Sequence, residues 1–161
     1  MTKIMSSDKP IRVIALSKSV NQVGLTGALT PITFINEVRK DDNHFAHSTS
    51  VNPQNITVLI AGWYKISYNI CFQNTAGGNN PASYRCRAYK NGALILGSMT
   101  QNSVDKAANT PYASCSATFY VECAANDIII VQTDGAVAGG AFGSGCSYTA
   151  QIDSSFLMER K

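Results

Sequence analysis

The ten residues Tyr64–Gln73 read YKISYNICFQ and alternate between large apolar or aromatic side chains and mostly polar ones. Successive side chains of a β-strand point to opposite faces of its sheet, so this period of two predicts a strand with one buried face. The buried face would carry two tyrosines, two isoleucines and a phenylalanine. The other face would carry Lys65 and its polar neighbours.

A hairpin is predicted next along the chain. Ser83–Lys90 alternates in the same way, and Asn91-Gly92 follows it directly, before the apolar run Ala93–Leu96. Asn-Gly between apolar runs is the strongest short-range hairpin signal, because both residues accept the positive φ that a two-residue turn requires.

Further strands fill most of the remaining chain. Ala113–Cys123 is a third long alternating strand, and a turn at 124–127 leads to Ile128–Thr133, whose nearly continuous apolar character is typical of burial on both faces. Other strands are expected at Ile11–Leu16, Ile32–Val38, Ile56–Leu59 and Ser147–Met158. Turn-rich loops are expected at Asn21–Pro31, Lys40–Gln54, Asn74–Pro81, Gln101–Pro111 and Gly135–Gly145. Eight or more short strands predict an all-β sandwich or jelly roll.

The composition fits one β-rich domain. The chain has 161 residues, of which 45% are hydrophobic and only 14% charged, against about 25% in average proteins. The net charge of +3 does not indicate a nucleic-acid partner, and no apolar run approaches the roughly 20 residues of a membrane span, so neither is expected. We expect residues 1–10, which lack the apolar core of a secretory signal, to form a flexible arm and 11–161 to form the domain.

The reactive side chains do not form a recognisable catalytic or metal motif. The five cysteines are odd in number and lack Cys-x-x-Cys spacing, which predicts free, buried thiols: Cys71, Cys86, Cys115, Cys123 and Cys146. His44 and His47, near Asp41 and Asp42, are interpreted as a solvated turn without a third metal ligand. No Gly-x-Ser-x-Gly elbow is present. We therefore expect no catalytic, metal or cofactor site, and no enzyme.

A basic cluster and the aromatic residues each leave two interpretations open. Arg85, Arg87 and Lys90 lie near one another on one strand, and they would form either a partner-binding patch or a solvated sheet face, with an arginine at a trimer axis as a variant of the second. The aromatic interleaving typical of single-stranded nucleic-acid binding is missing. Core packing is expected for most of the large aromatics, with subunit contacts as the alternative: Trp63, Tyr64, Tyr68, Phe72, Tyr84 and Phe119.

The order of the motifs resembles that of C1q/TNF-like globular domains, which are trimeric jelly rolls. The chain offers, in order, Ile32-Thr33-Phe34, His44-Phe45, Gly62-Trp63-Tyr64, Asn91-Gly92, Asn126-Asp127 and Ser154-Ser155-Phe156. The resemblance covers about residues 11–160 and implies a homotrimeric all-β jelly-roll sandwich. The positions that match the core and turn motif of the family are Phe34, Phe45, Gly62, Tyr64, Asn91, Gly92, Asp127 and Phe156.

The resemblance suggests a display module rather than one function, since this fold carries many roles. Without an apparent export signal, such a module suits a virus or bacteriophage: a trimeric capsid decoration (cement) or head-fibre protein, made in the host cytoplasm and displayed on the virion surface, with itself and a capsid protein as partners. One alternative is the receptor-binding tip of a phage fibre, which would recognise a host-surface glycan or protein. A second is an extracellular, secreted C1q-like ligand.

Overall fold

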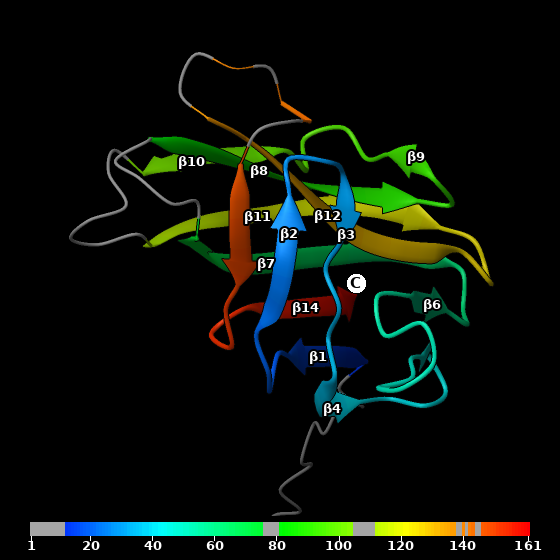
Figure 1. Ribbon diagram of the computed structural model, residues 1–161. Helices are drawn as coiled ribbons and strands as arrows, with labels where there is room; N and C mark the ends of the chain where they lie inside the picture. The colour runs from blue at the N-terminus through cyan, green and yellow to red at the C-terminus, as the bar shows by residue number, and fades with distance from the viewer. Residues whose placement is uncertain (1–11, 76–80, 105–111, 138–139, 141, 144–145) are drawn as a thin grey trace, which may run out of the picture.

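The computed structural model describes residues 12–75, 81–104, 112–137, 140, 142–143 and 146–161 (Figure 1). The arm expected at residues 1–10 lies outside this range, as does Ile11. Within the described residues the chain forms fourteen strands, and no helix there is long and apolar enough to cross a membrane.

The first sheet, named here the β7 sheet, is antiparallel and built around the longest strand. Its order across the centre is β4–β1–β14–β7–β11, and at the far end of β7 the strand β13 takes the place of β14 and pairs with β2. The bounds are β1 (Val13–Ser17), β2 (Gln22–Thr26), β4 (Asn36–Lys40), β7 (Gly62–Asn74), β11 (Tyr112–Cys123), β13 (Ser147–Ala150) and β14 (Ser155–Arg160).

The second sheet, the β8 sheet, packs against the first. Its order is β10–β8–β12–β6–β5, with β3 added to β12 and β9 to β8. The bounds are β3 (Thr30–Pro31), β5 (Phe45–Ala46), β6 (Ile56–Val58), β8 (Ala82–Lys90), β9 (Ala93–Leu94), β10 (Thr100–Val104) and β12 (Ile128–Val137). Two antiparallel sheets with these crossovers form a jelly-roll sandwich.

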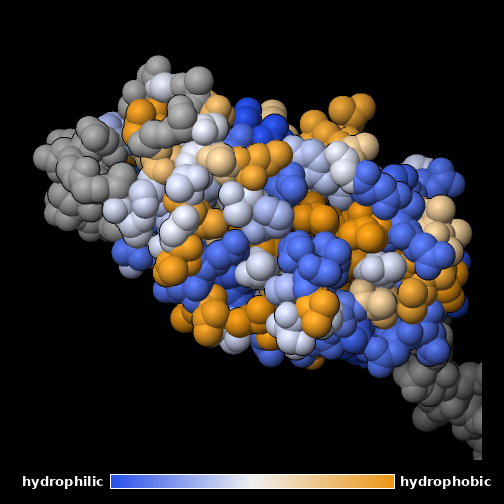
Figure 2. All heavy atoms as spheres, turned by 45° about the vertical axis from the view of Figure 1, so that its right-hand side comes forward, coloured by the Kyte–Doolittle hydropathy of each residue, from blue (hydrophilic) through white to orange (hydrophobic). Residues whose placement is uncertain are grey.

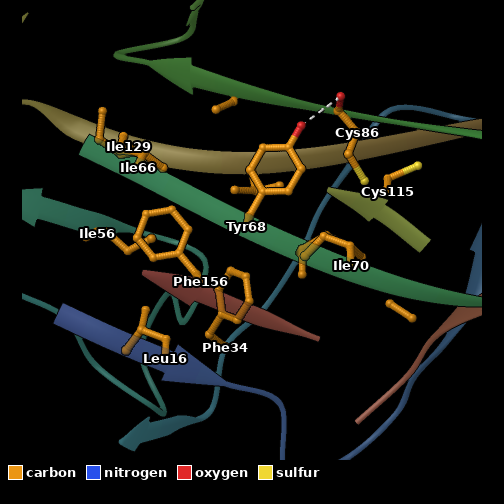
Figure 3. Close-up of a cluster of buried hydrophobic side chains, with 14 of the residues drawn as sticks. Leu16, Phe34, Ile56, Ile66, Tyr68, Ile70, Cys86, Cys115, Ile129 and Phe156 are labelled. Carbon is orange, nitrogen blue, oxygen red and sulfur yellow. Dashed lines mark hydrogen bonds between the residues drawn. The ribbon is translucent and has the colours of Figure 1, made fainter. Parts of the chain in front are cut away.

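The core lies between the two sheets (Figure 3). The inward side chains of β7, from Tyr64 to Phe72, are all buried, as the alternation predicts. Buried tyrosine hydroxyls need partners. The Tyr68 hydroxyl donates to the carbonyls of Cys86 and Ser98 across the sandwich. These bonds tie β7 to β8 and to the segment that follows β9.

The Asn91-Gly92 hairpin is confirmed. Both residues have positive φ, 51° and 82°, which is the conformation of a type I′ turn. Glycine reaches this region without strain, and asparagine tolerates it better than most residues. The turn joins β8 to the two-residue strand β9.

Three predicted segments differ from the structure. In the first, side chains are buried although their backbone is not part of a strand. Ile32–Val38 is not one strand: Ile32 and Phe34 are fully buried but irregular, and the strand begins only at Asn36. Their amides donate to the carbonyls of Val131 and Pro53 instead. Ser147–Met158 is broken into β13 and β14 by a turn at 151–154. Ile128–Thr133 alternates after all, with Ile130 half-buried on the outer side.

Several predicted loops contain strands that carry little hydrophobic signal. Asn21–Pro31 holds β2 and β3, Lys40–Gln54 holds β5, and Gln101–Pro111 begins within β10. β10 is a polar strand at the edge of the β8 sheet, and Val104 is its single buried residue. Gly135–Gly145 starts inside β12, which runs to Val137. Parts of the last two segments, and most of Asn74–Pro81, lie outside the described residues.

Candidate functional site

The side of the β7 sheet that faces away from the core carries a broad shallow groove of about 510 Å³. We call this side the outer face. No charged side chain lines the groove, although the same strands carry charged residues elsewhere, such as Lys65 on β7 and Glu122 on β11. The outward-facing residues that line it are Ala15, Ser17, Val38, Ser67, Asn69, Ser116, Thr118, Ser155 and Leu157.

The groove follows from the alternation of the strands that build it. In the middle of β7 and β11 large residues such as Tyr68 and Phe119 point inward, so the small polar residues of the period-two pattern share the outer side there. Registry places Ser67 opposite Thr118 and Asn69 opposite Ser116. Short side chains in adjacent rows leave the sheet surface low between its ends.

The polar groups of the groove bond to one another across the strands. The hydroxyl oxygens of Ser67 and Thr118 are 2.9 Å apart, and the Ser116 hydroxyl donates to Asn69 Oδ1 at 2.6 Å. A polar group that already has a partner costs less to remove from water than one without. The outer face is therefore suited to being covered by another protein surface.

Large exposed side chains lie in the groove or farther along the outer face. Trp63 is 54% exposed and Tyr120 is 59% exposed, and Val38 and Leu157 are exposed as well. Trp63 was expected in the core, and that expectation is wrong: odd positions of β7 all face outward. Tryptophan and tyrosine are enriched among the residues that dominate protein interfaces. Lys65 lies on the same face, and its cross-strand partners are Tyr120 and Glu159. Lys65 and Glu159 make this end of the sheet charged.

The family-motif residues have structural positions. The aromatic members Phe34, Phe45, Tyr64 and Phe156 are all in the core. Gly62 has a φ of 156°, a backbone conformation that residues with a side chain rarely adopt, and a Cβ there would also lie 2.9 Å from Arg160 Nε.

The turn members of the motif act together. Asn91 donates from its side-chain amide to Asp127 Oδ1 at 2.7 Å, and Asp127 Oδ2 accepts the Ala124 amide at 2.9 Å. The turn that contains Gly92 is thus held against the turn that contains Asp127. These contacts support the fold, and none of them reaches the outer face.

The structure separates Lys90 from the other two residues of the predicted basic patch, Arg85 and Arg87. Arg85 binds both carboxylate oxygens of Asp134, at 3.0 and 2.5 Å, and Arg87 binds Oδ2 at 2.6 Å. Arg85 also lies over the ring of Phe142, 4.1 Å from its centre. Asp134 is buried and follows Arg85 by 49 residues, so no local pattern indicates the pairing.

Lys90 has a different neighbourhood. Its Nζ donates to the Glu122 carbonyl at 2.8 Å and lies 3.6 Å from Asp127 Oδ2. It therefore belongs with the interlocked turns. The arginine pair, one carboxylate and one aromatic ring form a cluster with a single surplus positive charge.

The two histidines are not on a solvated turn, which corrects the interpretation from sequence. His44 Nδ1 lies 2.8 Å from Asp41 Oδ2, and His47 Nδ1 lies 3.0 Å from Glu37 Oε1. Both rings are largely or wholly covered. Within the described ranges, no three His, Cys, Asp or Glu side chains gather as a metal site would need.

All five cysteines are free, as predicted, and four of them are buried. Burial raises the pKa of Cys123 to about 11 and also raises that of Cys86, which favours the unreactive thiol form. Cys71 is the exception, because it is half-buried on β7 among the outward-facing residues. Its sulfur lies 3.3 Å from the Ser114 hydroxyl, one row beyond the groove.

A second surface feature, which sequence reasoning missed, follows β9. Leu96 is 86% exposed, and Leu94 and Met99 are exposed beside it. The segment is anchored from within: the Ser98 hydroxyl donates to the Ile95 carbonyl and accepts the amide of Ala88. Figure 2, which turns the β9 side forward, shows hydrophobic side chains projecting at the upper edge of the molecule. A fixed turn thus presents apolar side chains to solvent.

Comparison with known proteins supports the fold. No protein-family model and no curated protein sequence matches the chain. Among solved structures, a crystal structure of murine APRIL at pH 8.5 superposes with a TM-score of 0.58 at 11% identity, covering 92% of this chain and 98% of that one. Another, at pH 5.0, gives 0.52 at 11% identity, with 90% and 96% coverage. The chain therefore has a TNF-like jelly-roll fold, as predicted.

Proposed function

We propose that this domain is a binding and structural module that works as a homotrimer assembled through its outer face. The observation that supports it is the uncharged groove on an exposed sheet, lined by Val38 and Leu157, with Tyr120 and Trp63 exposed farther along the same face. Exposed Trp, Tyr and Leu side chains gathered on one uncharged face are typical of an interaction site. A second copy of the chain is a fitting occupant, because closed cyclic assemblies are the common form of soluble oligomers and C1q/TNF-like domains are trimers.

The setting that we propose first is a virion surface, with the trimer as a capsid decoration or head-fibre protein that folds in the host cytoplasm. The five free thiols support it, since cysteines remain reduced in cytoplasm and usually pair in secreted proteins. Its test is co-sedimentation of the purified chain with capsids of the virus that encodes it. Failure to sediment with them would contradict this setting and leave the trimer proposal untouched.

A second candidate function is recognition of a receptor or host-surface protein, either at a fibre tip or as an extracellular ligand. The rigid turn with Leu94, Leu96 and Met99 favours it, because preorganised apolar side chains bind a partner at a small entropic cost. Replacing Leu96 with Ser would weaken such binding while leaving the fold and the outer face unchanged.

The assembly proposal is tested by solution mass. Light scattering coupled to size exclusion is expected to give the mass of three chains for the wild type. Leu157→Arg places a charge on a residue that lines the groove. We expect this variant to have the mass of one chain and an unchanged circular dichroism spectrum. Val51→Arg, at an exposed residue away from the outer face, is the matched control and is expected to remain trimeric. A wild type that elutes as a monomer at all concentrations would contradict the proposal.

A further inference from the structure

His47 lies between β5 and β6 with no exposed side-chain surface. Its ring contacts two oxygens on opposite sides. Nδ1 is 3.0 Å from Glu37 Oε1, on β4, and Nε2 is 3.1 Å from the backbone carbonyl of Pro53. The ring thus bridges the edge strand of the β7 sheet and the loop that leads to β6.

Both oxygens can only accept hydrogen bonds. The Pro53 oxygen is a carbonyl and also accepts the amide of Phe34 at 3.0 Å. Burial works to raise the pKa of Glu37, but hydrogen bonds from His47 and Lys40 outweigh it and hold the pKa below its ordinary value, so the carboxylate is ionised. A neutral imidazole has one N–H donor and an imidazolium has two. The imidazolium alone completes both bonds.

We propose that His47 is a protonation-dependent latch that holds the loop 46–55 against β4. With the ring protonated, both hydrogen bonds form and the loop is tied to Glu37 through the ring. When the ring loses a proton, one nitrogen presents a lone pair to an oxygen, and that attachment is lost. Protonation of the ring therefore tightens the attachment and deprotonation loosens it, so the loop is held more firmly at lower pH than at higher pH.

The charged groups around the ring agree with this assignment. On β4, Lys40 Nζ lies 3.1 Å from Glu37 Oε1 and donates to the His47 carbonyl at 3.3 Å, so it ties the same two residues without titrating near neutral pH. Asp42 is 3.3 Å from that lysine and exposed. Asp41 pairs with His44 in the preceding turn.

The other segments around the ring carry no charged group that would replace the protonated imidazole of His47. Arg39, the remaining charged residue of β4, is exposed and has no ion pair among the described residues. The segments 48–55, β5, β6 and 32–35 contain no charged side chain. His47 is therefore the group whose titration changes this contact.

Nitrogen NMR of the full chain tests the latch directly. Ring nitrogens are followed from pH 5 to 8.5 together with the backbone amides of Phe34 and Asn55, which report on Pro53 and on the loop. We expect both His47 nitrogens to carry protons at pH 5. We expect one proton to be lost as pH rises, with the two amides shifting at the same midpoint.

Two variants separate the latch from general effects of pH. His47→Gln is expected to abolish the pH dependence of the Phe34 and Asn55 amides, and His44→Gln, the matched control, is expected to retain it. A His47 ring that is neutral at pH 5 would overturn the proposal, as would a ring that titrates without moving the amides. If His47→Gln does not fold, the wild-type titration still decides between these outcomes.

Discussion

Single buried polar side chains show how this domain accommodates hydrophilic groups in its interior. Burial raises the pKa of Tyr68, Tyr84 and Tyr148, so these phenols stay neutral, and the hydroxyls of Tyr68 and Tyr148 act as donors. Lys18 is the harder case: it is 4% exposed, and its Nζ donates to the Thr33 carbonyl at 2.9 Å and to Gln22 Oε1 at 3.4 Å. No carboxylate pairs with it among the described residues.

Replacing Lys18 with Met is expected to stabilise the protein near neutral pH. Burial lowers the pKa of Lys18 to about 8, so the folded state disfavours its charge. This cost is fully present below pH 8 and disappears as pH rises towards 10.5, where the unfolded lysine also becomes neutral. We expect a gain of about 1 kcal/mol at pH 7, kept small by the lost bond to Thr33 and by solvent screening.

Urea unfolding of both proteins between pH 7 and 10.5 measures the effect, and the difference should shrink as pH rises. Lys161→Met, at an exposed position, is the control and should show no such trend. A difference between Lys18→Met and wild type that stays constant over this range would contradict the assignment.

At the scale of elements, two turns distant in the sequence are interlocked. The Asn91 amide donates to the Ile128 carbonyl at 3.0 Å, and Asn91 Oδ1 accepts the Ile128 amide at 2.8 Å. Asp127 joins them by accepting the Asn91 side chain. The β8–β9 hairpin and the start of β12 are therefore fixed as one unit. Asn91 and Asp127 therefore share one structural role, that of fixing these two turns against each other.

Asp127→Ala is expected to cost about 1–3 kcal/mol at pH 7, because the Ala124 amide and the Asn91 side chain lose their acceptor. Burial works to raise the pKa of Asp127, but hydrogen bonds from Ala124 and Asn91, with the charge of Lys90, outweigh it and lower the pKa. The carboxylate then contributes stability above about pH 4, which is lost as pH falls through its lowered pKa.

Denaturant unfolding at pH 7 and pH 3 should therefore show a large difference between wild type and Asp127→Ala at pH 7 and a smaller one at pH 3. Asp153→Ala, at an exposed carboxylate without a side-chain partner among the described residues, should match the wild type at both. An equal loss at the two pH values would show that the charge of Asp127 contributes nothing.

For the whole molecule, the two sheets present different surfaces. The outer face of the β7 sheet is uncharged at its centre and paired across its strands. The outer side of the β8 sheet holds the Arg85, Arg87 and Asp134 cluster beneath Phe142. Assembly through the first surface leaves the second, and the turn with Leu96, open to a partner.

The reactivity of Cys71 tests the proposed assembly. It is the one thiol that is not buried within the monomer, and it lies one row beyond the groove. We expect a thiol reagent to modify no cysteine rapidly in the trimer and one per chain in the monomeric Leu157→Arg variant. Cys71→Ser in that variant should abolish the fast reaction. Fast labelling of wild type and variant at the same rate would place the subunit contact elsewhere.

Much of this architecture could be predicted from local pattern. The alternation of Tyr64–Gln73, the Asn91-Gly92 turn and the free cysteines all follow from side-chain period, positive φ and thiol chemistry, which are properties of neighbouring residues. The polar edge strands β2 and β10 could not be predicted, because their partners, β13 and β8, supply the ladder and their own side chains carry little hydrophobic signal.

The candidate surfaces depend on contacts between residues far apart in the chain. Trp63 is a large aromatic residue of the kind that usually packs in a core, but it faces solvent because the odd-numbered residues of β7 point away from the core. The sequence predicts a basic patch at Arg85 and Arg87, but in the structure Asp134 of β12 pairs with both. It predicts a solvated turn at His47, but Glu37 and Pro53 enclose the ring. Periodicity is a local property that fixes which side chains share a face; which faces and charges meet is set by the pairing of strands across the sandwich, and that required the tertiary structure.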